Sequence, residues 1–476
     1  MDFNVEKYKI FDNILKNQDY LNHEIIETIG KALSLCNPYI WEKIDKILLD
    51  IIIYNEKNLK IECYKGLPED LPSIRALIWK INFRYLPHDI KKWKDILQLK
   101  RAEYLEIKNA FILRKKEEIK IFEEIEKEKE FEKKVELIKE KENEYNKKVE
   151  NENLKIDEII NNQNNQKNNI NSLENLEECT DRNLLELINK DINRTHIDMS
   201  FFNSLVNKNR TMSKEEQDKM YTDKNNCTYT NYKNVYTKYR DKKDIFENEL
   251  HCDVIERILY IYSKLNKDIG YVQGMNELIA PIYYCFCIDT TEKLENIEAD
   301  SFWCFTLLMK DIKKLFLKEN DNKKGGIFDK LYILELIISK LQGDIYKTLK
   351  NNNVSIFNFA FSWINLFFSQ EFLMPDTLRL WDIIFSEKDR FSFVYFFCMA
   401  ILEYKKEKIK YKDFSDIITE IRDLQNENIE KIIHMAINFK NKYEKKVNEI
   451  ISKYNHDEKK YMEIFSKYEN SIFKAK

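Results

Sequence analysis

The sequence predicts an all-α protein, from three observations: few glycines and prolines, apolar residues at helical spacing, and a high content of charged residues. The 476 residues include only 7 Gly and 6 Pro. β-Sandwiches and barrels need many tight turns, and Rossmann-type folds need glycine-rich loops, so both are disfavoured. Hydrophobic residues make up 43% of the chain, enough for a large core. Charged residues make up 34%, above the usual quarter, which indicates solvated surface or extended charged helix.

The net charge argues against one class of function. Lys and Arg together number 79 and Asp and Glu 82, which gives a net charge of −3. A chain that binds nucleic acid along its whole length would show a basic excess. The sequence also lacks the P-loop, G-x-S-x-G and H-E-x-x-H strings of the commonest nucleotide, hydrolase and zinc sites.

The first elements are predicted helices separated by a turn. Residues 1–60 form a helical N-terminal extension in this interpretation. Gly66-Leu67-Pro68 and Leu71-Pro72 mark a turn, and the apolar residues over 74–81 then recur at the spacing of a helix. The main domain is predicted to cover 61–440.

Two polar stretches interrupt this domain. Residues 106–182 are predicted to be an insertion, because they contain a Lys/Glu-rich segment (114–148) and an Asn/Gln-rich segment (161–169). Residues 207–246, rich in Lys, Asn, Thr and Tyr, are predicted to form a long loop.

The remaining chain is predicted to be helical, intracellular and reduced. Residues 250–440 are dense in apolar positions, and 441–476 are predicted to form a charged C-terminal helix. No C-x-x-C pair occurs, and Cys285 and Cys287 lie in an apolar run, which favours buried thiols over a metal site. The N-terminus lacks the apolar core of a signal peptide, and no apolar run reaches the ~20 residues that span a bilayer. We therefore expect a cytoplasmic protein with no metal and no transmembrane segment.

The first string of functional interest is I-N-K-D-I-N-R-T, from Ile188 to Thr195. On a helix, Ile188, Asp191 and Arg194 share one face, so that Asp191 could hold the Arg194 side chain by an ion pair. Taken alone, the string also fits an ordinary surface salt bridge.

The second string is G-Y-V-Q-G-M-N, from Gly270 to Asn276. Two of the seven glycines bracket three residues, which predicts a shaped turn between two helices that presents Tyr271 or Gln273. A helix C-cap at Gly270 is the alternative, but it leaves Gly274 without a purpose.

A third string contains Ser362-Trp363, Glu371 and Trp381-Asp382, whose aromatic residues are expected in the core. With it, the order of motifs resembles the TBC domain of Rab GTPase-activating proteins. The matching residues are Gly66-Leu67-Pro68 to Trp79-Lys80, I-x-x-D-x-x-R, Y-x-Q and Trp381-Asp382, and the resemblance spans about 66–425.

The resemblance implies a two-lobed, V-shaped helical domain that binds a GTP-loaded Rab and regulates vesicle trafficking. It implies that Arg194 is an arginine finger and Gln273 a glutamine finger, both acting in trans. Asp191 and Tyr271, together with Ile188, Gly274 and Asn276, would support them. The chain would then be a GTPase activator and not an enzyme on its own. It would carry no cofactor, because GTP and Mg²⁺ belong to the partner GTPase, and membrane association would be peripheral or through partners.

One residue departs from the family pattern. The family commonly has Arg before the tryptophan of the third string, where this chain has Ser362. The departure leaves open a module that binds a Rab without accelerating hydrolysis. A second alternative is a tethering scaffold with a coiled coil at 114–148, but its apolar positions drift from a strict heptad. His196, which follows Arg194 closely, is assigned no role.

Overall fold

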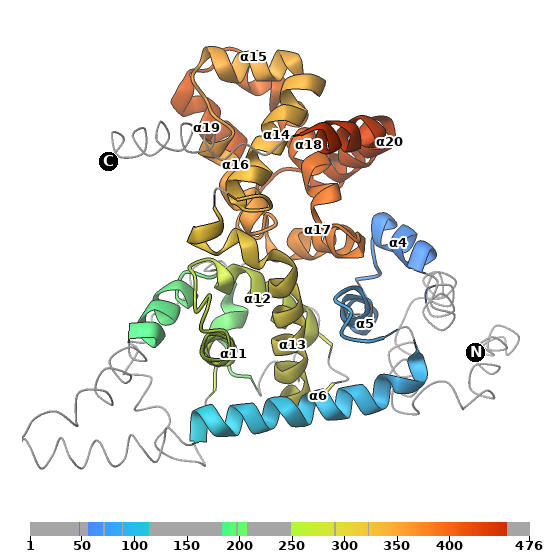
Figure 1. Ribbon diagram of the computed structural model, residues 1–476, viewed down its shortest axis with the longest axis vertical. Helices are drawn as coiled ribbons and strands as arrows, with labels where there is room; N and C mark the ends of the chain where they lie inside the picture. The colour runs from blue at the N-terminus through green and yellow to red at the C-terminus, as the bar shows by residue number, and fades with distance from the viewer. Residues whose placement is uncertain are drawn as a thin grey trace, which may run out of the picture. The chain divides into compact units, whose positions relative to one another are not determined.

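The computed structural model describes residues 47, 56–69, 72–87, 89–113, 183–196, 199–206, 249–289, 292–321 and 323–454 (Figure 1). The chain divides into two compact units. The first comprises Met1–Ala102, Ile188–Thr228 and Glu249–Lys476, and the second comprises Glu103–Leu187 and Tyr229–Asn248. The second unit contains the whole of the predicted insertion, 106–182, and its described residues, 103–113 and 183–187, are helical.

The prediction of an all-α fold is confirmed for the described residues, whose only β interaction is an isolated bridge between Leu205 and Leu250. A helix that covers 183–192 contains the first part of the first string, from Ile188 to Ile192. The other α-helices are α4 (Glu56–Lys65), α5 (Pro72–Asn82), α6 (Trp93–Lys108), α11 (His251–Leu265), α12 (Met275–Cys287), α13 (Leu294–Ile312), α14 (Ile327–Leu341), α15 (Gly343–Asn351), α16 (Phe357–Asn365), α17 (Met374–Ser386), α18 (Phe391–Ile409), α19 (Phe414–Arg422) and α20 (Ile429–Lys453). Short helices lie at Ile90–Lys92, Asn109–Leu113, Ser200–Asn203, Lys313–Leu315 and Lys318–Asn320.

Helix α12 lies at the centre of the first unit. Every residue from Met275 to Cys287 is buried. A helix that is apolar on all sides must be surrounded, and α12 packs against α5, α11, α13 and α17 (Figure 1). The surrounding helices therefore hold the N-terminus of α12 in place, and the preceding loop, Gly270–Gly274, connects directly to it.

A buried ion pair joins two parts of the chain that are distant in sequence. The Arg75 guanidinium of α5 donates through Nε to the Asp382 carboxylate of α17 at 3.1 Å, and the Trp79 indole donates to the same carboxylate at 2.8 Å. Burial raises the pKa of Asp382, whereas Arg75 and Trp79 favour its charged form. The Gly66–Lys80 and Trp381-Asp382 strings thus meet in the core and are structural.

A second buried carboxylate organises the packing around α13. Asp300 accepts hydrogen bonds from Lys80 Nζ at 2.6 Å, from the Tyr85 hydroxyl at 2.8 Å and from Arg101 Nε at 3.0 Å. Burial alone would raise the pKa of Asp300, but Lys80 and Arg101 hold it below its usual value. The carboxylate therefore stays charged and connects α5 and α6 to α13.

Several predicted boundaries can be compared with the helices. The turn at Gly66 is present, with φ of 92° at Gly66 between α4 and α5. The boundary placed between 440 and 441 falls inside the continuous helix α20. Most of 1–60, the segments 114–148 and 161–169, and all of 207–246 lie outside the described residues.

Cys285 and Cys287 are buried thiols outside any disulfide, as predicted, and burial raises the pKa of the Cys285 thiol well above its usual value. In the described ranges, no group of acidic, histidine or cysteine side chains could hold a metal ion, and no helix is both long and apolar enough to cross a membrane.

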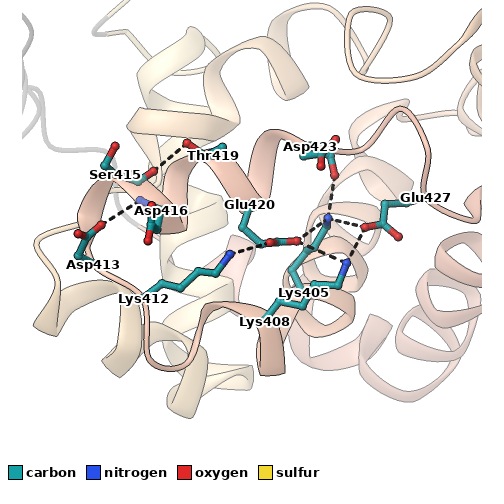
Figure 2. Close-up of polar contacts among 10 residues, drawn as sticks. All are labelled: Lys405, Lys408, Lys412, Asp413, Ser415, Asp416, Thr419, Glu420, Asp423 and Glu427. Carbon is teal, nitrogen blue, oxygen red and sulfur yellow. Dashed lines mark hydrogen bonds and ion pairs between the residues drawn. The ribbon is translucent and has the colours of Figure 1, made fainter.

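A polar cluster joins the C-terminal end of α18 to α19 and to the connection between α19 and α20 (Figure 2). The fully buried Lys405 Nζ donates to Glu427 at 2.6 Å, to Glu420 at 3.0 Å and to the Asp423 carbonyl at 2.7 Å. Lys412 also donates to Glu420, and Lys408 to Glu427. A buried ammonium needs such partners, so the cluster fixes the α19–α20 connection.

This cluster predicts a loss of stability in acid. Bonds from Lys412 and Lys405 lower the pKa of Glu420 from 4.5 to about 2. Partial burial opposes the same shift at Glu427, but bonds from Lys405, Lys408 and Tyr404 also lower its pKa to about 2. Depressed carboxylate pKa values give stability that is present above about pH 4.5 and is lost as the pH falls towards 2.

Glu427→Gln should therefore be less stable than the wild type at pH 6, by about 1 kcal/mol, and this difference should shrink at pH 3. Urea unfolding followed by circular dichroism at both pH values measures it. The matched control is Glu407→Gln, at an exposed position on α18. A difference for Glu427→Gln that is constant with pH would contradict the assignment.

Candidate functional site

The predicted finger residues lie on two short turns. Arg194 is exposed in the turn 193–196, which follows the helix covering 183–192. Gln273 is exposed in the loop between α11 and α12. Long polar side chains at exposed turn positions can reach a partner, while the buried residues beside them determine where each turn lies.

The arginine turn is built from local hydrogen bonds. The Arg194 amide donates to the Asp191 carbonyl at 3.0 Å, and the Thr195 hydroxyl donates to the same carbonyl at 3.0 Å. His196 adopts φ of 43°, a left-handed conformation that ends the turn. Ile188, which is fully buried, anchors the preceding helix in the core.

This geometry corrects the expectation that Arg194 shares a helix face with Asp191. The helix stops at residue 192, so Arg194 lies beyond its end. Between these two described residues no ion pair is formed: the Asp191 carboxylate instead accepts a hydrogen bond from the Tyr271 hydroxyl at 2.8 Å. Asp191 therefore supports the arginine turn through its backbone carbonyl and through a bond to the glutamine loop.

The glutamine loop has the shape that its two glycines predicted. Gly270 has φ of 61° and its amide donates to the Asn266 carbonyl, which closes the end of α11. Gly274 has φ of 100°, and its amide donates to the Asn276 side-chain carbonyl at 3.1 Å. Positive φ at both positions favours glycine. The loop consequently turns sharply on either side of the segment that contains Gln273.

A buried polar network connects the two turns. Asn276, at the start of α12, donates through Nδ2 to the Thr195 hydroxyl at 2.8 Å and to Glu277 Oε1 at 3.0 Å. It also lies 3.4 Å from the Asp191 carbonyl, and its own carbonyl accepts from Tyr271 at 3.3 Å. Two bridges, Tyr271–Asp191 and Asn276–Thr195, thus connect the segments that carry Gln273 and Arg194.

Burial determines which group donates in the hydrogen bond between Tyr271 and Asp191. Tyr271 is 8% exposed, and burial followed by its bond to Asp191 raises the pKa of its phenol well above the usual value. The hydroxyl therefore remains protonated and donates. In a buried setting a satisfied network holds its members rigidly, because an unpaired polar group is costly.

Three residues of the site were not predicted from the sequence. Thr195 and Glu277 receive the two short bonds of Asn276, and His196 Nε2 lies 3.7 Å from Glu277 Oε2. His196 also stacks on Phe202, with ring centroids 5.8 Å apart. The available signal was a polar residue directly after each motif, Thr195 after Arg194 and Glu277 after Asn276. Spacing alone did not distinguish these residues from ordinary polar surface residues.

Tyr271→Phe is expected to lower the free energy of unfolding by about 1–3 kcal/mol, because the Asp191 carboxylate loses its buried donor. In this variant, the rate of any reaction that needs both the arginine turn and the glutamine loop should also fall. Tyr85→Phe is the matched control, since its hydroxyl donates to buried Asp300 at the same 2.8 Å away from both turns. Thermal unfolding and single-turnover hydrolysis with a partner GTPase measure the two effects. Equal rate losses in both variants would contradict the role of Tyr271.

Ser362, which stands where the family commonly has Arg, forms a hydrogen bond with Glu371. Its hydroxyl donates to Glu371 Oε1 at 2.6 Å. Burial raises the pKa of Glu371, while Ser362 and Arg422 partly favour its charged form. The departure from the family pattern thus leaves a satisfied serine–glutamate pair in place of an arginine.

Comparisons with known proteins place this geometry in context. Residues 203–410 match the family model of the Rab-GTPase-TBC domain, a range that includes Gln273 and begins after Arg194. TBC1 domain family member 13 from Homo sapiens is 30% identical over 399 residues, covering 78% of this chain and 91% of the relative. TBC domain-containing protein C1952.17c from Schizosaccharomyces pombe is 24% identical over 469 residues, covering 81% of this chain and 70% of that protein.

A solved structure supports the same fold. The crystal structure of the Ypt/Rab-GAP domain of Gyp1p superposes with a TM-score of 0.54 at 20% identity. The superposition covers 84% of this chain and 98% of that domain.

Proposed function

Because the chain belongs to the TBC-domain family of Rab GTPase-activating proteins, we propose that it accelerates GTP hydrolysis by a Rab-family GTPase with Arg194 and Gln273 as fingers in trans. The observation that carries the proposal is the network between the two turns. Arg194 and Gln273 are both exposed, and the segments that present them are joined by the Tyr271–Asp191 and Asn276–Thr195 bonds.

The arginine supplies what the transition state lacks. GTP hydrolysis is limited by charge on the γ-phosphoryl oxygens and by placement of the attacking water. A guanidinium is permanently charged and presents a planar fork of donors that fits phosphate oxygens. Arg194 would stabilise the developing charge, with an expected contribution of about 10³–10⁵ in rate.

The glutamine has a complementary role. One amide group offers both an acceptor and donors, so Gln273 can accept a hydrogen bond from the attacking water and donate one to the γ-phosphate. In Ras-like GTPases the GTPase itself supplies this glutamine. Here Gln273 supplies it in trans, and membrane trafficking is the process that the activity regulates.

The proposal is tested by single-turnover hydrolysis with a panel of GTP-loaded Rabs. We expect one or a few Rabs to be accelerated by catalytic amounts of the protein. Binding measured in parallel separates the alternatives. A Rab that binds at full affinity but is never accelerated would contradict the proposal and identify a non-catalytic Rab-binding module.

A further inference from the structure

A strained turn lies between α16 and α17. Phe367 and Phe368 have φ of 49° and 63°, the left-handed region that bulky side chains rarely adopt. Both side chains are fully buried. Two successive residues in this conformation persist only when the surrounding structure holds them, and strain of this kind clusters at functional positions.

The interactions that hold the turn come from α17 and α18. The Trp381 indole donates to the Phe367 carbonyl at 2.8 Å. The Phe367 ring packs on Phe391 with centroids 5.4 Å apart, and the Phe368 ring meets Phe397 edge to face at 4.9 Å. An indole N–H that caps a carbonyl and a set of ring contacts on both sides leave this backbone little freedom.

The start of the turn lies against the glutamine loop. Leu366, its first residue, is 6% exposed and lies against Gly274. A Cβ added to Gly274 would be only 2.9 Å from Leu366 Cδ2. The absence of a side chain at Gly274 therefore serves two needs: its φ of 100°, and the close approach of Leu366 to the backbone that follows Gln273.

We propose that the turn Leu366–Ser369 is a positioning element for Gln273, with Leu366 as the positioning residue and Trp381 as its support. The inference rests on the proposed function. Gln273 is exposed, so neighbouring side chains do not restrict it strongly, and its placement depends on the backbone of the loop. Asn276 fixes that loop from the α12 side, and Leu366 fixes it from the α16–α17 side.

A shift of the glutamine loop should lower the rate because catalysis is sensitive to the orientation of the catalytic group. A displacement of about 1 Å in a catalytic group can cost about 10²-fold in rate. Truncation of Leu366 opens space beside Gly274 and lets the loop shift without removing any donor or acceptor from the site. The loss should therefore appear in kcat and leave Rab binding unchanged.

The test compares Leu366→Ala with the conservative variant Leu366→Met and with Leu349→Ala. Leu349 is buried to 1% on α15, which packs on α14 and α18, so its truncation controls for a general loss of core packing. We expect Leu366→Ala to lower kcat about 10- to 100-fold with KM for the Rab within about twofold. Leu366→Met should restore most of the rate, and Leu349→Ala should not change kcat.

A double-mutant cycle asks whether Leu366 acts through Gln273. In a Gln273→Ala background, Leu366→Ala should cause no further loss of kcat, because the group that it positions is gone. The same loss in both backgrounds, or a loss of equal size in Leu349→Ala, would overturn the proposal.

Hydrogen exchange supplies a readout independent of activity. Trp381→Phe keeps an aromatic ring but removes the donor to Phe367, and it serves if Leu366→Ala does not fold. Both variants should speed exchange of the amides at 272–275 relative to the wild type, with the α14 amides unchanged. Unchanged exchange at 272–275 would contradict the positioning role. If the wild-type protein accelerates no Rab, the proposed function fails, whereas the exchange experiment still decides whether Leu366 and Trp381 hold the loop.

Discussion

Replacing Arg194 with lysine is expected to lower the stimulated rate of GTP hydrolysis by about 10³-fold or more, or at least about 4 kcal/mol of barrier. A lysine ammonium is a point charge on a flexible stem and cannot present the planar fork of a guanidinium to phosphate oxygens. The fold should be unaffected, because Arg194 is exposed. Single-turnover hydrolysis with the responding Rab measures the rate, and circular dichroism checks the fold.

The matched control for this prediction is Lys190→Ala. Lys190 is an exposed cation on the helix that precedes the arginine turn. Removing it tests whether the loss of any positive charge in this region lowers the rate of hydrolysis. We expect a rate within about twofold of the wild type. Near wild-type stimulation by Arg194→Lys would show that Arg194 is not the finger.

Gln273→Ala is expected to lower the stimulated rate by about 10²–10³-fold, the usual effect of removing one preorganised group from a transition state. Affinity for the GTP-loaded Rab should change little, because the glutamine acts on the water and the γ-phosphate. Separate measurements of kcat and KM under steady-state conditions distinguish these effects.

Gln425→Ala provides the control for Gln273→Ala, since Gln425 is an exposed glutamine in the connection between α19 and α20. It should leave both constants unchanged. A rise in KM with kcat preserved in Gln273→Ala would show that Gln273 contributes to binding and not to catalysis.

The features predicted correctly from the sequence were those determined by local chemistry. Gly270 and Gly274 predicted a shaped turn between two helices, and both have positive φ there. The scarcity of glycine and proline, with apolar residues at helical spacing, predicted the all-α fold. These signals depend on the conformational preferences of residues close together in the chain.

The features that sequence reasoning missed depend on contacts across long separations. The spacing of Asp191 and Arg194 suggested an ion pair, but the carboxylate bonds to Tyr271, 80 residues away. Asp382 likewise binds Arg75 across 307 residues. The position of Arg194 after the helix end depends on the Thr195 hydroxyl and on the left-handed His196, which helical periodicity does not reveal.

The central claim is that the catalytic glutamine comes from this chain, and one measurement tests it directly. The responding Rab is prepared with its own switch glutamine replaced by alanine, and single-turnover hydrolysis is followed with wild-type protein and with Gln273→Ala. We predict that the wild type still accelerates the altered Rab strongly and that Gln273→Ala does not. Stimulation that disappears when the Rab loses its glutamine, with Gln273 intact, would contradict the account.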